Sequence, residues 1–249
     1  MSKTLTYLFD PLCGWCYGAS PALASIIEST GVGLELLPTG LFAGHGARPM
    51  DMGMASHAWT NDQRIEELTG QIFSLTYRDQ VLCNFHQPMD STAATLALTA
   101  VAQTQPQREF EALQRIQRAR YVDGCNITEL HTLGELLRGL GLCDAERLQA
   151  ATPELHAATN QRIDQACTLM NALSARGVPG FVIQDEGEQR LLPSSMLFSQ
   201  PMHFARQVCG ISQAELDNRP APVTGPAGHG VIRRTSARTA APMPARRPC

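Results

Sequence analysis

The residues with the clearest chemistry are two cysteines, Cys13 and Cys16, in the run Cys13-Gly14-Trp15-Cys16. A thiolate, unlike a thiol, attacks disulfides at neutral pH, and a second thiol close by can then resolve the mixed disulfide. Two cysteines with two residues between them therefore predict thiol–disulfide exchange, in which one thiol attacks and the other resolves.

Two other uses of this cysteine pair are weaker. A structural zinc site usually needs four ligands, commonly supplied as two such pairs. The other cysteines are single and widely scattered: Cys83, Cys125, Cys143, Cys167, Cys209 and Cys249. We therefore expect no metal and no other bound cofactor, and a purely structural disulfide is the minor alternative. We expect the scattered cysteines to be free thiols, most of them in the core, Cys167 for example.

The segments on either side place the pair between a strand and a helix. Leu5, Tyr7 and Phe9 occupy alternate positions, which is typical of a short strand. After the pair, apolar residues recur with the helical period at Ala19, Ala22, Leu23, Ile26 and Ile27. Cys13 then lies near the N-terminus of that helix, where unpaired N–H groups and the helix dipole stabilise a thiolate.

The remaining chain alternates between strand and helix patterns. Residues 34–37 predict a second strand, and residues from about 55 to 176 have an almost entirely helical pattern. Strand patterns return at 177–183 and at 190–192 across an acidic turn, which predicts a β-hairpin, and a last helix covers roughly 200–209. This layout predicts an α/β protein in which a helical block interrupts the sheet.

The charge distribution weighs against nucleic-acid partners, and the hydropathy pattern weighs against a membrane span. All 23 acidic residues precede Asn218, whereas six of the 20 basic residues follow it. An acidic body does not attract nucleic-acid phosphates. The start, MSKTLTYLFD, lacks the pattern of a secretory signal, and no apolar run reaches the length of a membrane span. We expect a cytoplasmic protein, with a disordered tail from Asn218 that is rich in Pro, Ala, Gly and Arg.

Four polar side chains in or beside the helical block are weaker candidates: His45, Arg48, His57 and His86. They could line a substrate pocket opposite the cysteine pair, and a histidine near Cys16 could lower a thiol pKa. The simpler expectation for any one of them is a surface or hydrogen-bonded loop residue.

Several segments in order resemble the DsbA family of thiol–disulfide oxidoreductases, and most closely its FrnE-like cytoplasmic branch of predicted protein-disulfide isomerases. They are FDPLCGWCYG, GLFAGHGARPM, LTGQIF, PMDSTAATLALTAV, ARYVDGCNITELHTL and ARGVPGFVI, across about residues 4–210. The resemblance implies a thioredoxin-like fold with a large all-helical insertion between the second strand and the cis-proline strand. We expect thioredoxin-like parts at 1–44 and 161–217, a helical insertion domain at 45–160 and a disordered tail at 218–249.

The resemblance also implies roles for single residues. Cys13 corresponds to the attacking thiol, Cys16 to the resolving thiol and Pro179 to the cis-proline that faces them. A cis-proline there would leave the backbone of Val178 free to pair with an extended substrate. Trp15 lies between the cysteines, and we expect it to be exposed and to face the substrate.

Three residues depart from the family or need a role of their own. Tyr7 stands where thioredoxin-like enzymes often hold a buried acid, six positions before the attacking cysteine. Asp10 is the nearest carboxylate, and we expect it to cap the helix rather than to relay a proton. Gly180 stands where the family usually has a larger residue, which predicts a wider groove.

The leading interpretation is a thiol–disulfide oxidoreductase or protein-disulfide isomerase. Its partners would be disulfide- or thiol-containing proteins or small molecules, with glutathione among the candidates. The first alternative is a glutathione-dependent transferase or isomerase of the kappa or hydroxychromene-carboxylate type, which carries serine at the active position. The second is a client-binding module without catalytic activity.

Overall fold

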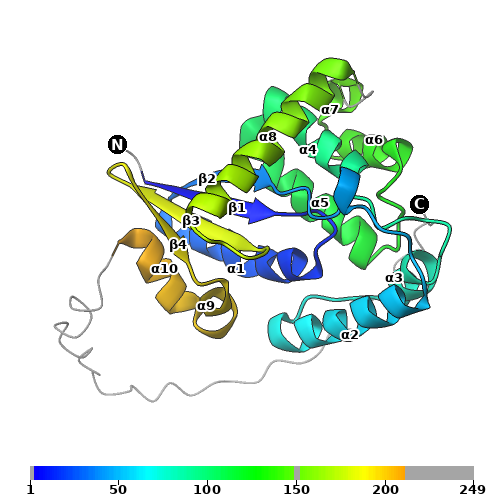
Figure 1. Ribbon diagram of the computed structural model, residues 1–249, viewed down its shortest axis with the longest axis horizontal. Coiled ribbons are helices and arrows are strands. Elements are labelled where there is room, and N and C mark those ends of the chain that lie inside the picture. Colours follow the sequence, from blue (N-terminus) through cyan, green and yellow to red (C-terminus); the bar gives the residue numbers. More distant parts are fainter. Residues whose placement is uncertain (1–2, 149–151, 211–249) are drawn as a thin grey trace, which may run out of the picture. The chain divides into compact units, whose positions relative to one another are not determined.

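A mixed sheet of four strands carries the cysteine pair. The computed structural model describes residues 3–148 and 152–210, and its strands are β1 (Thr4–Phe9), β2 (Gly33–Pro38), β3 (Gly180–Asp185) and β4 (Glu188–Leu192). Their order is β2-β1-β3-β4; β1 runs parallel to β2 and antiparallel to β3, and β3 and β4 form a hairpin (Figure 1). Because Leu8 pairs with Gly180, the end of β1 lies beside the start of β3. The loops that leave these two strand ends therefore meet at one edge.

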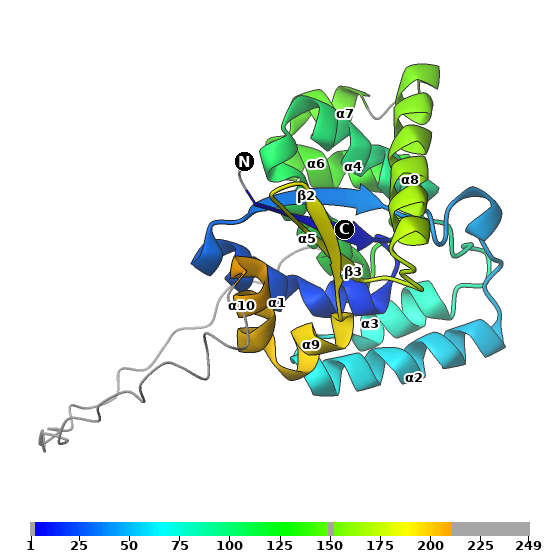
Figure 2. The ribbon, with the colours of Figure 1, turned by 60° about the vertical axis from the view of Figure 1, so that its left-hand side comes forward.

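The alternation along β1 builds a core on each face of the sheet. Tyr7 and Phe9 belong to the core that includes α1 (Gly14–Thr30), α9 (Ser194–Ser199) and α10 (Pro201–Cys209). Leu8 points the other way and packs with Ala166 of α8 (Pro153–Ala172). Figure 2 shows the sheet between α8 on one side and α1, α9 and α10 on the other.

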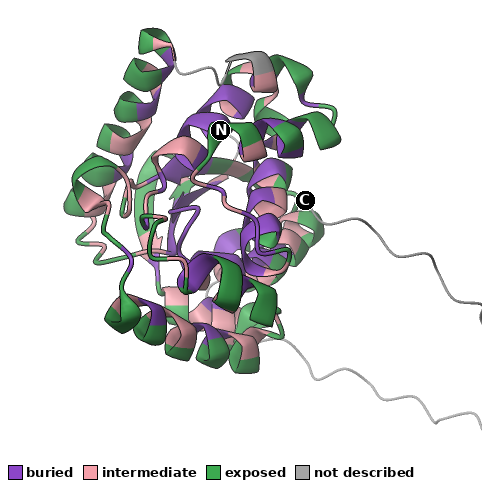
Figure 3. Cartoon of the chain, turned by 90° about the vertical axis from the view of Figure 1, so that its right-hand side faces the viewer, coloured by how far each residue is buried: buried purple, intermediate pink, exposed green. Residues whose placement is uncertain are grey.

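The block between β2 and β3 is helical, as its periodicity predicts. Besides α8, its helices are α2 (Met52–Thr69), α3 (Leu75–Tyr77), α4 (Thr92–Thr104), α5 (Glu109–Tyr121), α6 (Leu130–Gly139) and α7 (Cys143–Leu148), with a π-helical turn at Arg78–Leu82 and short 3-10 turns at Gly44–Gly46 and Pro106–Arg108. Helix α4 is buried from Ala94 to Val101, whereas the outer turns of α2 and α8 are exposed (Figure 3).

The structure corrects the prediction for the scattered cysteines. Cys125 is buried, but Cys83, Cys143, Cys167 and Cys209 are exposed. Cys167 follows Ala166, which faces the sheet, and one helical residue turns the side chain by roughly 100° away from that face. Helix α9 is a second difference, because the sequence pattern gave no expectation of it.

The predicted boundaries of the chain stand as follows. The boundary at residue 160 lies inside α8, and the division into a thioredoxin-like body and an insertion domain stays a prediction. The compact unit described here ends at Gly210, which ends α10 in a left-handed conformation with φ 79°. The tail predicted at 218–249 lies outside the described residues.

Candidate active site

The cysteine pair lies at the start of α1, as predicted. Cys13 is the N-cap of that helix, with extended backbone angles (φ −83°, ψ 116°), and its side chain makes no capping hydrogen bond. Cys16 follows one turn inside the helix. The Cys13 side chain is 8% exposed and Cys16 is fully buried. Cys13 is therefore the accessible thiol of the pair, next to the positive end of the helix dipole.

Asp10 shapes the loop before the helix but does not cap it, which corrects the prediction. Its buried carboxylate accepts hydrogen bonds from Leu12 N at 2.9 Å, from Phe42 N at 3.1 Å and from Ser91 Oγ at 2.8 Å. The Cys13 N–H bonds to the Asp10 carbonyl at 3.1 Å. Burial raises the pKa of Asp10, and these hydrogen bonds oppose the rise. The residue thus holds the cysteine loop against the segment after β2 and the start of α4.

The loop before β3 meets Cys13 across 165 positions of sequence. The Val178–Pro179 peptide bond is cis, as expected, and Cys13 Sγ lies 3.8 Å from the Val178 carbonyl oxygen. Ser194, at the start of α9, donates a hydrogen bond to the Pro179 carbonyl. Gly180 pairs with Leu8 of β1, and a Cβ there would lie 3.1 Å from the Leu8 side chain. The glycine thus allows a close approach of β3 to β1.

Tyr7 occupies the position, six residues before Cys13, at which thioredoxin-like enzymes often hold a buried acid. Its hydroxyl donates to the Cys16 carbonyl at 3.1 Å, and burial raises the pKa of this tyrosine well above its usual value. Burial also raises the pKa of the Cys16 thiol, as do a hydrogen bond with Cys13 and the charge of Cys13, while a hydrogen bond from Tyr7 opposes the rise. Cys16 therefore favours the protonated thiol when Cys13 is reduced.

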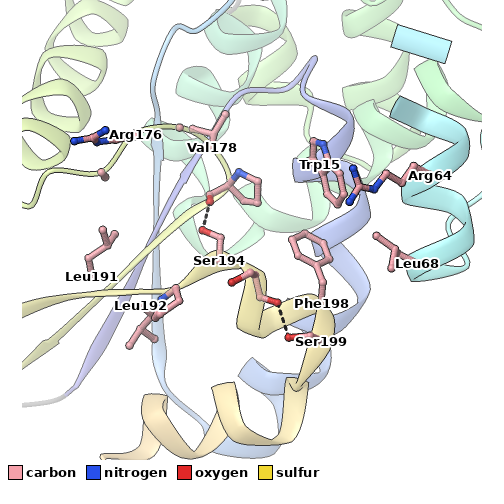
Figure 4. Close-up of a pocket in the computed structure, with 15 residues that line it drawn as sticks. Trp15, Arg64, Leu68, Arg176, Val178, Leu191, Leu192, Ser194, Phe198 and Ser199 are labelled. Carbon is pink, nitrogen blue, oxygen red and sulfur yellow. Dashed lines mark hydrogen bonds between the residues drawn. The ribbon is translucent and has the colours of Figure 1, made fainter. Parts of the chain in front are cut away.

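An apolar groove of about 620 Å³ lies on one side of the pair (Figure 4). It runs between Trp15, the C-terminal half of α2, the cis-proline loop and α9, and its lining includes Leu68, Val178, Pro179, Leu192 and Phe198. Trp15 is half-buried rather than exposed as predicted, because its ring packs edge-on against Phe198 at a centroid distance of 5.3 Å.

Two arginines, Arg64 of α2 and Arg176 before the cis-proline loop, also line this groove and are exposed. Figure 4 shows the Arg64 side chain reaching toward Trp15. Neither arginine forms an ion pair within the described part of the chain. The groove therefore combines apolar walls with two positive charges.

A second cavity of about 290 Å³ opens on the other side of Cys13, between the start of α1, α2 and the segment after β2. Arg48 and His57 are among its lining residues. His57 is also exposed and hydrogen bonded to Asn61, in line with the simpler expectation for these four candidates. The other two candidates, His45 and His86, are not among the described residues that line this cavity. The cavity also contains Asp62, which the sequence analysis did not single out.

Asp62 belongs to a buried polar cluster at the base of this cavity. Its Oδ2 accepts a hydrogen bond from the Tyr77 hydroxyl at 2.9 Å, and the Arg120 guanidinium lies 5.5 Å from the Tyr77 ring centroid and 5.7 Å from that of Tyr121. Burial raises the pKa of Asp62 to about 7, against the opposing effects of Tyr77 and Arg120. Asp62 shares the inner face of α2 with buried Ala55 and Ile65, so an acid at an apolar position of a helix was the available signal.

The described residues were also compared with the requirements of a metal site and of a membrane-spanning helix. The described residues contain no group of three or more His, Cys, Asp or Glu side chains that could hold a metal ion. Within the same residues, no helix is both long enough and apolar enough to span a bilayer.

Comparisons with known proteins agree with this geometry. A family model for the DsbA-like thioredoxin domain matches residues 4–208. The cytosolic disulfide reductase DsbM from Pseudomonas aeruginosa is 36% identical, and the match covers 82% of this chain and 96% of DsbM with a TM-score of 0.73. A structure of DsbM with GSH matches with the same identity and coverage and a TM-score of 0.71. The comparison with curated proteins finds no match.

Two more distant structures show the fold alone. A protein from Nitrosomonas europaea, whose assignment as a protein disulfide isomerase is itself provisional, is 20% identical over 84% of this chain and 97% of its own, with a TM-score of 0.68. A 2-hydroxychromene-2-carboxylate isomerase is 14% identical over 84% of this chain and all of its own, with a TM-score of 0.51. Together with the family match, they confirm an α/β, thioredoxin-like fold with helices inserted between β2 and β3.

Proposed function

Because this chain belongs to the DsbA-like thioredoxin domain family, we propose that it is a thiol–disulfide oxidoreductase that works through Cys13 and Cys16. One observation carries the proposal: Cys13 is both the N-cap of α1 and 3.8 Å from the Val178 carbonyl. The helix N-terminus stabilises a thiolate, and the neighbouring loop offers a backbone group to a substrate that reaches it.

The chemistry has two exchange steps. The Cys13 thiolate attacks one sulfur of a substrate disulfide, forms a mixed disulfide and releases the other substrate sulfur as a thiolate that takes a proton from water. Cys16 then loses its proton to water and attacks the Cys13 sulfur, which releases the second substrate thiol and leaves a Cys13–Cys16 disulfide. The substrate gains two electrons from the pair, and the reverse sequence oxidises a dithiol.

The environment of Cys16 supports this order of events. The thiol of Cys16 has a raised pKa because it is buried and because Cys13 contributes a hydrogen bond and a charge. A mixed disulfide at Cys13 removes that negative charge. Loss of the Cys16 proton is then easier after the first step than before it, so the resolving thiol becomes active only when it is needed.

The groove beside the pair supports a substrate-binding role for Trp15, Val178 and Pro179, which all line it. Its apolar walls suit an extended peptide segment, and Arg64 and Arg176 suit carboxylates on that segment. We propose that its substrates are thiols and disulfides of proteins or small peptides, with glutathione as one of them. The structure of DsbM, which is 36% identical to this chain, has been determined with GSH.

We also propose a cytoplasmic location, in line with the description of DsbM as cytosolic.

The test is turnover of a disulfide substrate by single-cysteine variants. Cys13→Ser should abolish reduction of insulin or of oxidised glutathione, whereas Cys16→Ser should accumulate a mixed disulfide that mass spectrometry detects. Cys83→Ser is the matched control, because Cys83 is an exposed free thiol that lines neither cavity beside the pair, and its loss should leave turnover unchanged. Full activity of Cys13→Ser would overturn the proposal. Conjugation of glutathione to an aromatic electrophile by the wild-type protein would favour the transferase alternative.

A further inference from the structure

The carboxylate of Asp62 lies against the first residue of the helix that Cys13 caps. A Cβ atom added to Gly14 would lie 2.5 Å from Asp62 Oδ1. At Gly14, α2 therefore brings an acidic group to the N-terminus of α1. A larger residue in place of Gly14 would displace the Asp62 carboxylate. Asp62 and Cys13 also line the same cavity. The two groups thus share one end of one helix dipole.

The surroundings of Asp62 hold it in place but do not neutralise it by direct contact. Asp62 is only 4% exposed, and its Oδ2 is bonded to the Tyr77 hydroxyl. Arg120 is the buried cation nearby, yet it lies over the rings of Tyr77 and Tyr121, and its Nε has no hydrogen-bond partner in the described chain. Arg48 and His57 also line this cavity, and they are the further charged or titratable side chains on its described walls.

We infer that Asp62 and Cys13 compete for a single negative charge at the N-terminus of α1, so that Asp62 is a positioning residue that sets the reactivity of Cys13. Two negative charges that line one cavity at the same end of a helix repel each other, and the second therefore ionises with more difficulty than the first. The role given to Asp62 rests on the proposed role of Cys13 as the attacking thiol.

The competition links the redox state of the pair to a proton. In the oxidised protein, Cys13 is in a disulfide and carries no charge, so Asp62 ionises without opposition. When the pair is reduced and Cys13 becomes a thiolate, Asp62 tends to take up a proton from water. Burial raises the pKa of Asp62 to about 7, which places this exchange in the neutral range, where the reaction would run. Tyr77 sets the balance because its hydrogen bond favours the ionised carboxylate.

The experiment measures how fast iodoacetamide modifies Cys13 as a function of pH. It is carried out in a Cys16→Ser background, so that only one thiol of the pair reports, and peptide mass spectrometry reads the modification at Cys13. In Asp62→Asn, the amide keeps a hydrogen-bonding group at Tyr77 but carries no charge. We expect the half-maximal pH of modification to fall by roughly one unit, so that the rate rises up to about tenfold above pH 7 and below the parent's midpoint, where Asp62 is ionised. At pH 5, where Asp62 already holds its proton, the two rates should agree.

Two further variants make the result decisive. Glu67→Gln removes a charge from an exposed position of the same helix, and its profile should follow that of the parent. Tyr77→Phe removes the hydrogen bond to Asp62 and should shift the profile in the same direction as Asp62→Asn but by less, and it carries the test if Asp62→Asn does not fold. Profiles of the Asp62 and Tyr77 variants that coincide with the parent would overturn the inference. Because the assay needs no turnover, its failure is distinct from failure of the proposed exchange activity.

Discussion

Replacing Asp62 by asparagine should change how the stability of this protein depends on pH. Asp62 has its pKa raised from 3.8 to about 7 on folding, because it is buried, and it is only 4% exposed. A carboxyl with a raised folded-state pKa binds its proton more tightly when folded. Its contribution to stability is therefore fully present below pH 3.8 and is lost as the pH rises toward 7.

The size of the effect follows from the two pKa values. A difference of about 3 units corresponds to about 4 kcal/mol over the whole pH window. Of this, about 2–3 kcal/mol falls between roughly pH 5 and pH 8, because up to about pH 7 the folded protein keeps a proton at Asp62 that the unfolded chain has already lost. For a protein of this size, that range corresponds to a relative change in Tm of roughly 5–10 °C.

The assay is urea unfolding of the fully reduced protein at pH 5, 6, 7 and 8, for the wild type and for Asp62→Asn. The substitution itself changes the free energy of unfolding by an amount that does not depend on pH. On top of this, the stability of the variant relative to the wild type should rise by about 2–3 kcal/mol between pH 5 and pH 8. Glu67→Gln should show no such trend, because its side chain is exposed. A difference that stays the same from pH 5 to pH 8 would refute the reasoning that Asp62 is protonated in the neutral folded state.

Two further predictions concern the same surroundings. Gly14→Ala should destabilise the protein by about 1–3 kcal/mol in urea unfolding, since its Cβ would lie 2.5 Å from Oδ1 of Asp62, a carboxylate whose Oδ2 is hydrogen bonded to Tyr77. Gly139→Ala is its control: within the described part of the chain, no atom outside its own helix lies within 4 Å of that added Cβ, so it should be neutral or stabilising. Equal losses in both variants would contradict the steric explanation. Arg64→Gln and Arg176→Gln should each raise the KM for oxidised glutathione by about 3–10-fold at low salt and by less at high salt, while kcat changes little. An unchanged KM at low salt in both variants would remove the groove from the substrate site.

Local sequence was sufficient for the parts of this protein whose structure depends on neighbours in the chain. The alternation at Leu5, Tyr7 and Phe9 predicted β1 and its inward face, and the apolar period after Cys16 predicted α1. Gly31 ends that helix with φ 64°, a conformation that glycine adopts without steric cost. The position of Cys13 at the N-terminus of α1 also followed, because a helix end is set within a few residues.

Contacts between distant segments needed more than the local pattern. The resemblance to a known family, and not the spacing of residues, supplied Pro179 as the partner of Cys13, although 165 positions separate Cys13 from Val178. Trp15 was expected to be exposed, but it is half-buried against Phe198, on a helix that no periodicity had indicated. Whether an aromatic side chain is covered depends on which other element packs there.

The sequence by itself predicted thiol–disulfide exchange at the pair, because two cysteines with two residues between them stand at the start of a helix. Only the tertiary structure decided what surrounds them. Asp10 was expected to cap α1, yet it binds Leu12, Phe42 and Ser91. Asp62 was not singled out, yet it meets Gly14 from a helix some 50 positions away. A carboxylate has its function set by its burial and by the charges around it, and both arise only when separate segments of the chain pack together.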